Sequence, residues 1–177
     1  MSATMNNPIV RAYALLEELT PLTTDCGAVC DGRCCQESAD SEGMLLFPGE
    51  EVMLAAEDGY TIRPADGGYL LTCGGTCDRT RRPLACRIFP LFPYVTEEGR
   101  VRAVYDPRGY RMCPLVRECA HVPLDRDFVR AVRMAGRILM EDPACAAFLR
   151  QNSREIDELN RLVGLDGERP PIARRKP

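Results

Sequence analysis

The sequence predicts a small α+β domain, in which an irregular, metal-organised region with short β-hairpins is flanked by helices and followed by a C-terminal helical hairpin. Three observations predict this fold. Apolar residues recur at helical spacing towards both ends of the chain, apolar runs in its middle flank turns that contain glycine, and nine of its ten cysteines lie between residues 26 and 119. With 177 residues, 45% hydrophobic and 28% charged, the chain has the composition of one globular domain.

The first expected element is an amphipathic helix that begins at Asn7 and Pro8, because an asparagine cap followed by a first-turn proline is typical of a helix start. Pro21 ends it. Its apolar residues recur at helical spacing and are Ile9, Ala12, Tyr13, Leu16 and Leu19. The following segment, 25–42, has no apolar period and is rich in Gly, Asp, Ser and Cys, which predicts an irregular loop suited to chelation.

Residues 48–57 predict a short helix, since they begin with a proline, carry acids in the first turn and are followed by Gly59. Residues 60–73 predict a β-hairpin around Asp66-Gly67-Gly68. A second hairpin is expected where 91–95 and 101–105 flank a short turn that contains Gly99.

The C-terminal part predicts two helices. Asp125 caps the first, and Asp142 with Pro143 begins the second. Their core-facing residues are Phe128, Val132, Ala135 and Leu139 in the first and Phe148, Ile156, Leu159 and Val163 in the second. The expected organisation is a cysteine-cluster metal-binding domain with the N-terminal helix (1–123), a helical hairpin that packs on it (124–165) and a flexible tail (166–177).

The location of the protein decides how its cysteines are interpreted. Residues 1–20 lack the basic region and the apolar run of a signal peptide, and no later run is long enough to span a membrane, so we expect a cytoplasmic protein. Cytosolic thiols are kept reduced, which favours metal ligation over disulfides. The net charge of -3 offers no excess of positive charge for a nucleic acid or an anionic membrane, and neither partner is expected.

A single histidine means that a tetrahedral metal site must be built mostly from thiolates. The candidate ligands, several of them separated by short intervals, are Cys26, Cys30, Cys34, Cys35, Cys73, Cys77, Cys86 and Cys113. Eight thiols suit two four-thiolate sites, or one cluster and a second ion. In an extended backbone the adjacent Cys34 and Cys35 would point to opposite sides, so that each could serve a different metal.

Two arginines, Arg82 and Arg87, lie close to Cys86. Four thiolates around Zn²⁺ or a [4Fe-4S]²⁺ core leave a net charge of about -2, which needs hydrogen bonds or neutralisation if the site is partly buried. We expect one or both arginines to donate to the sulfurs. The alternative is that they are surface residues of a loop that Pro83 and Pro90 restrict.

The run Cys26-x3-Cys30-x3-Cys34-Cys35, followed by Cys77 and by Arg82-Pro83-x2-Cys86-Arg87-x-Phe89-Pro90, resembles the YkgJ-like cysteine-cluster family. That family is described as zinc- or iron-chelating. The resemblance covers roughly residues 25–114 and implies the same eight cysteines as ligands. The interval between Cys73 and Cys77 is shorter than the family's, so Cys119 is an alternative to Cys73. We expect His121 to be a loop residue and Cys145 to be a small buried hydrophobe.

Both an iron-sulfur cluster and Zn²⁺ are compatible with this thiol set. Zinc would act as a redox-inert staple, and the pair Cys113-Pro114 is familiar from iron-sulfur proteins. No catalytic residue and no glycine-rich cofactor turn is evident. Two alternatives to a metal-binding protein stay open: a cluster-dependent enzyme that resembles flagellin lysine N-methylase, and a protein-interaction module stapled by its metal.

Overall fold

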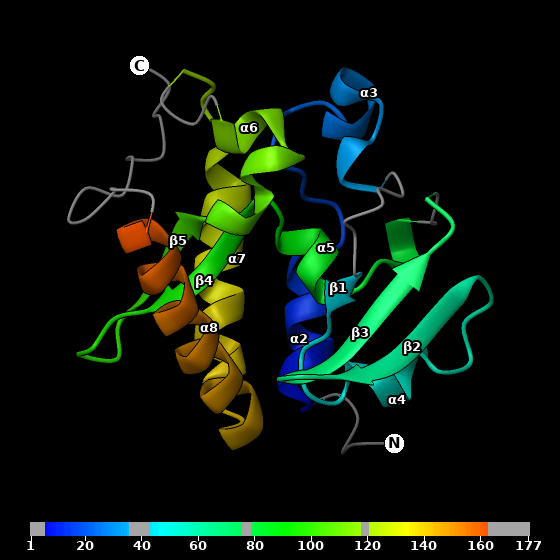
Figure 1. Cartoon of the computed structure of the whole chain (residues 1–177), viewed down its shortest axis with the longest axis vertical. Helices are drawn as coiled ribbons and strands as arrows, with labels where there is room; N and C mark the ends of the chain where they lie inside the picture. Colours follow the sequence, from blue (N-terminus) through cyan, green and yellow to red (C-terminus); the bar gives the residue numbers. More distant parts are fainter. Residues whose placement is uncertain (1–5, 36–42, 76–78, 118–120, 163–177) are drawn as a thin grey trace.

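The computed structural model describes residues 6–35, 43–75, 79–117 and 121–162. Its α-helices are α2 (Pro8–Leu15), α3 (Cys26–Cys30), α4 (Glu50–Leu54), α5 (Leu84–Ile88), α6 (Pro114–Arg117), α7 (Arg126–Leu139) and α8 (Pro143–Leu162). Its strands are β1 (Met44–Leu45), β2 (Tyr60–Ala65), β3 (Gly68–Cys73), β4 (Leu91–Val95) and β5 (Val101–Tyr105), and its 3-10 helices are η1 (Arg33–Cys35), η2 (Arg79–Arg81) and η3 (Pro107–Arg111). Figure 1 shows this mixture of helices and small sheets, which confirms the predicted α+β class.

Both predicted hairpins form. β2 and β3 pair antiparallel with Tyr60 opposite Cys73, and their turn contains Gly67, whose positive φ of 82° favours glycine. β4 and β5 have the predicted bounds, and every residue of β4 is buried. The two-residue strand β1 pairs with β3 and was not predicted, because two residues carry no periodic signal.

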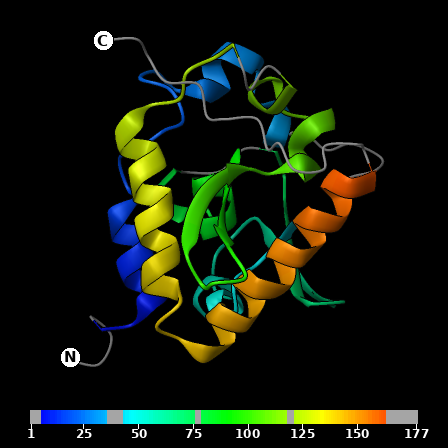
Figure 2. The same cartoon turned by 90° about the vertical axis from the view of Figure 1, so that its left-hand side faces the viewer.

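The two C-terminal helices pack mainly against the β4–β5 hairpin and only slightly against each other. Figure 2 shows α7 and α8 diverging from their connecting turn along two sides of this hairpin. As predicted, Asp125 caps α7, and its carboxylate accepts the backbone N–H groups of Asp127 and Phe128 at 2.9 and 3.0 Å. None of the helices in the described ranges is both long and apolar enough to cross a membrane.

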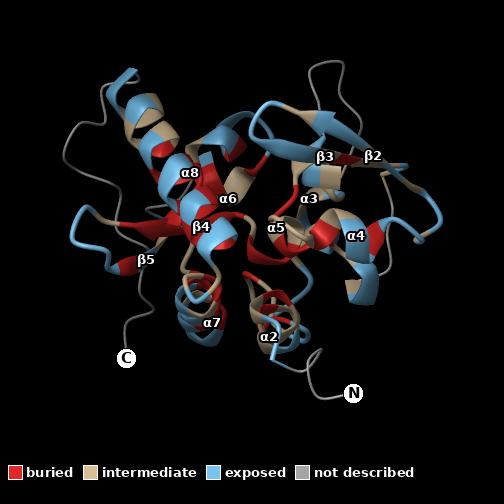
Figure 3. Ribbon diagram, turned by 90° about the horizontal axis from the view of Figure 1, so that it is seen from below, coloured by how far each residue is buried: buried red, intermediate tan, exposed pale blue. Residues whose placement is uncertain are grey.

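The main core lies where α2, α7 and α8 meet the β4–β5 hairpin, and α5 belongs to it as well. The rings of Phe47 and Phe148 lie 4.9 Å apart in this core, and Phe128 is fully buried. Figure 3 shows the buried residues gathered on the inward sides of these elements. The three-stranded sheet has a smaller cluster of its own around Leu46, Leu54 and Leu71.

Two segments differ from prediction. α2 ends at Leu15 rather than at Leu19, and the N–H of Leu16 donates to the carbonyl of Tyr13 in a tighter final turn. Beyond the helix, the Arg79 side chain donates to the carbonyl groups of Glu17 and Leu19 at 3.2 and 2.5 Å. The predicted loop 25–42 is helical in part, since Asp25 caps α3 and η1 follows it. The remainder of that loop, Cys77, Cys119 and the predicted tail 166–177 lie outside the described residues.

Candidate metal centre

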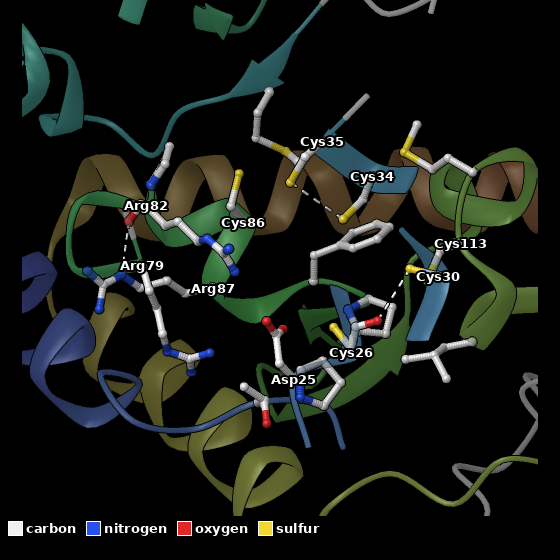
Figure 4. A pocket seen from close by; sticks show the side chains of 18 of the residues that line it. Asp25, Cys26, Cys30, Cys34, Cys35, Arg79, Arg82, Cys86, Arg87 and Cys113 are labelled. Carbon is white, nitrogen blue, oxygen red and sulfur yellow. Dashed lines mark hydrogen bonds between the residues drawn. The ribbon is translucent and has the colours of Figure 1, made fainter. Parts of the chain in front are cut away.

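One pocket of about 460 Å³ collects almost all of the cysteines that the structure describes. Seven of these eight cysteines line it: Cys26, Cys30, Cys34, Cys35, Cys73, Cys86 and Cys113. They come from α3, η1, β3, α5 and the residue before α6. Figure 4 shows six of them around the pocket together with Asp25 and three arginines. Sequence spacing alone does not bring these elements together.

The first cysteines are presented by two short turns of helix. The Asp25 carboxylate accepts the N–H of Gly27 at 3.0 Å and caps α3, so that Cys26 and Cys30 lie one turn apart on the same helix face. The Cys30 thiol donates to the carbonyl of Cys26 at 3.4 Å. α3 ends at Cys30, and the next residue, Asp31, caps it with a left-handed φ of 53° before the chain enters η1.

Cys34 and Cys35 lie in η1, where the backbone N–H of Cys35 donates to the carbonyl of Gly32 at 2.7 Å. The backbone is therefore not extended, and the expected placement of the two side chains on opposite sides of the chain is wrong. Their sulfurs lie only 3.9 Å apart. Two thiolates bound to one tetrahedral zinc at about 2.3 Å would lie about 3.8 Å apart. The pair thus faces the same part of the pocket.

Cys86 and Cys113 come from the well-packed side of the pocket. Cys86 lies in α5, and Cys113 is buried, with its backbone N–H donating to the carbonyl of Gly109 at 2.8 Å. Gly109 allows a close approach here, since a Cβ at that position would lie 2.7 Å from the ring of Phe89. These two thiols are held by the core, unlike those of α3 and η1.

The buried Glu50 positions α5, a role that the sequence did not predict. Its carboxylate accepts the N–H of Leu84, the first residue of α5, at 2.7 Å and the N–H of Phe47 at 2.8 Å. The Tyr13 hydroxyl also donates to it. Burial raises the pKa of Glu50 above its ordinary value, and these hydrogen bonds oppose that change. The sequence showed only an acid in the first turn of a short helix.

The arginines at the pocket hold the backbone around it. Arg87 is buried, donates to the carbonyls of Arg82 and Thr80 at 2.9 and 2.6 Å, and lies 4.5 Å from the centre of the Tyr13 ring. Arg79, which the sequence did not single out, fixes the chain after α2. Donation from Arg82 or Arg87 to the sulfurs stays a prediction.

The thiols interact electrostatically across the pocket. Burial, together with the nearby Cys30, Asp25 and Cys113, raises the pKa of Cys26 to about 11, and the positive charge of Arg82 opposes this change. The hydrogen bond between the two adjacent thiols raises the pKa of Cys34, whereas the same bond, helped by the positive charge of Arg82, lowers the pKa of Cys35 to about 6. Arg82 thus favours thiolates on both α3 and η1.

The remaining candidate residues lie apart from this pocket or outside the described ranges. Cys145 is buried against the carbonyl of Pro48 at 3.8 Å, as expected of a small buried hydrophobe. His121 is exposed in a turn. Among the described residues, no three His, Cys, Asp or Glu side chains are grouped closely enough to hold a metal ion as they lie. The donor chemistry of the pocket, seven thiols, nevertheless suits thiophilic metals.

No protein-family model, curated protein or solved structure matches this chain.

Proposed function

We propose that this chain is a cytoplasmic metal-binding protein, whose pocket cysteines bind an iron-sulfur cluster or zinc. A single observation carries the proposal: seven of the eight described cysteines line one pocket although they come from five separate parts of the chain. The eighth, Cys145, is a buried thiol of the core. Thiols that serve only as small apolar residues would be expected in the core rather than together at one pocket.

The packing of the thiol-bearing segments supports the proposal. Neither α3 nor η1 has a buried residue, so apolar burial contributes little to their position. Metal binding supplies free energy to segments of this kind, because the ligands are brought together only in the folded chain. The four thiols of α3 and η1 would close on Cys86 and Cys113, which the core holds in place.

The number of thiols favours more than one metal atom for each chain. One tetrahedral zinc takes four thiolates, as does one [4Fe-4S] cluster, and the pocket offers seven. Two four-thiolate zinc sites would need the seven thiols and Cys77 as the eighth, whereas one cluster would leave three of the seven to spare. Zinc would brace the fold, whereas a cluster would supply electron-transfer or Lewis-acid chemistry.

Metal analysis of anaerobically purified protein tests the proposal. Brown protein with broad visible absorbance and several iron atoms for each chain identifies a cluster. Colourless protein that contains zinc identifies a structural zinc site. Cys86→Ser should lower the metal content, while the control Cys145→Ala should leave it unchanged. Metal-free protein with oxidised cysteines, or equal metal content in Cys86→Ser and the wild type, contradicts the proposal.

A cluster-dependent enzyme is the second candidate, and the apolar wall of the pocket is the observation in its favour. Leu19, Val29, Phe89 and Leu115 line the pocket beside the thiols, which leaves room for an organic group next to a cluster. Calorimetric titration with S-adenosylmethionine tests this candidate. Binding that requires the cluster supports it, and the absence of binding to cluster-loaded protein rejects it.

A further inference from the structure

A second hollow, of about 640 Å³, lies between β5 and α7, and none of the described residues that line it also lines the thiol pocket. Four arginines surround it: Arg100, Arg102, Arg133 and Arg137. Its other lining residues include Val129 and Met140, which give it apolar surface between the charges. The metal-binding proposal makes no use of this hollow.

A close approach of α7 to the β4–β5 hairpin builds the hollow. A Cβ at Gly136 would lie 2.5 Å from the Cβ of Pro93 and 2.7 Å from Cγ1 of Val101, so only glycine allows this helix and strand to come so near. Arg133 and Arg137 lie on either side of Gly136 in the sequence, and Arg100 and Arg102 on either side of Val101. The contact therefore brings four guanidinium-bearing side chains, from α7, from β5 and from the turn before β5, around one hollow.

The positive charge at this place is not balanced within the described residues. α7 carries exposed arginines at positions 126, 130, 133 and 137, a spacing that puts them on one helix face and makes neighbours repel one another. Arg130 pairs with Asp127 at 2.9 Å, and Arg100 pairs with Glu98 at 3.3 Å. Within the ranges that the structure describes, Arg102, Arg133 and Arg137 form no ion pair. This local excess contrasts with the net charge of -3.

We propose that this hollow, the arginine hollow, binds an acidic segment of a partner protein, with glutamate or aspartate carboxylates on the arginines and apolar side chains between them. The planar guanidinium group binds a carboxylate through two parallel hydrogen bonds, which suits arginine to this partner. Among the described residues, no aromatic side chain lines the hollow to stack on a base, and the chain as a whole is acidic, so a nucleic acid fits it less well. The side chains of Val129 and Met140 supply the apolar contacts.

Fluorescence anisotropy with a labelled peptide of alternating glutamate and leucine tests the proposal on the full-length, metal-loaded chain. The variant Arg133→Glu/Arg137→Glu should weaken binding roughly tenfold or more, because it replaces attraction by repulsion at the hollow. Added salt should weaken binding to the wild type. The matched control is Arg150→Glu/Arg154→Glu on α8, which changes the charge equally at two exposed arginines with the same spacing. It should leave the affinity within about twofold, since exposed charges outside the contact contribute little to binding.

Three outcomes overturn the proposal: no peptide binding by the wild type, equal weakening in both variants, or tighter binding of single-stranded DNA or of phosphatidylserine vesicles than of the peptide. Circular dichroism establishes that both variants fold. The metal content of Arg133→Glu/Arg137→Glu should equal that of the wild type, because the arginine hollow and the thiol pocket have no described residue in common. Failure here is thus distinguishable from failure of the metal-binding proposal.

Discussion

The segment that carries the first four cysteines and the unit formed by β4, β5, α7 and α8 are held in place by different means. Helices α3 and η1 have no buried residue, whereas α7 buries six residues and α8 buries seven. Figure 3 shows the same contrast between α3 and the inward faces of α7 and α8. Apolar burial accounts for the second region. The first region gains its position from caps, turns and, as we propose, a metal.

The thiol pocket connects the first region with residues that belong to the main core. Cys86 and Cys113 lie on elements that belong to the main core, while Cys26, Cys30, Cys34 and Cys35 lie on elements without buried residues. One side of the candidate centre is therefore preformed, and the other side is free to adjust to a ligand. On the metal-binding proposal, packing would build one half of the site and chelation would complete the other.

Metal removal should have the largest effect and should separate the two regions. The apparent binding free energy of structural zinc is about 10 to 16 kcal/mol, and much of it would be lost from the segment that lacks a core. We expect residues 26–35 to lose amide protection after anaerobic chelation, while α7 and α8 keep theirs. Hydrogen exchange measured by mass spectrometry checks this. An equal loss of protection in both regions would show that they are not held in place by different means.

Loss of a core side chain should affect the other region most. Phe128 is fully buried in α7, so Phe128→Ala should lower the free energy of unfolding of the metal-free protein by about 3 to 5 kcal/mol. Val29 of α3 is 70% exposed, and Val29→Ala should change it by less than about 0.5 kcal/mol. Urea unfolding of both variants measures the difference. Similar losses in the two variants would show that α3 shares the core after all.

A change at Glu50 should act on α5, the helix that carries Cys86. Glu50→Gln places an amide N–H₂ against a backbone donor, which should cost about 1 to 3 kcal/mol and loosen α5. Because burial raises the pKa of Glu50, this carboxyl group stays protonated in the folded chain at a pH where it is already ionised in the unfolded chain. The contribution of Glu50 to stability is thus greatest at low pH and decreases as the pH rises from its ordinary value towards the raised one.

Urea unfolding at a series of pH values, with the wild type and Glu50→Gln side by side, checks both parts of this prediction. The difference in stability between the two proteins should diminish as the pH increases. A difference that grows with pH would mean that the hydrogen bonds to Glu50 outweigh its burial.

The smallest expected effect compares two helix caps of the same chemistry. Asp125→Ala removes the cap of α7 and should cost about 1 kcal/mol of global stability. Asp25→Ala removes the cap of the five-residue helix α3, and it should leave the unfolding of the metal-free protein nearly unchanged while it weakens metal binding. Thermal unfolding and competition with a chromogenic chelator measure the two quantities. Equal destabilisation of the metal-free protein by both variants would argue against a difference in how the two regions are held in place.

Much of the secondary structure was predictable because its signals are local. The cap at Asp125, the proline at position 143 and the glycine turns of both hairpins act within a few residues, and the elements they predict are present. The end of α2 was missed because neither proline nor glycine occurs between Leu15 and Pro21 to mark it. The helical turn at α3 was missed because a five-residue helix carries too short a pattern.

By itself, the sequence determined the number, spacing and chemistry of the thiols, the mixed fold class and most element positions, since these follow from residue type and near neighbours. Only the tertiary structure decided that seven described cysteines share one pocket, that Glu50 supports the helix of Cys86, and that arginines of β5 and α7 surround one hollow. These arrangements join residues far apart in the chain. They depend on which surfaces pack together, as at Gly136, and no local sequence pattern predicts such tertiary contacts.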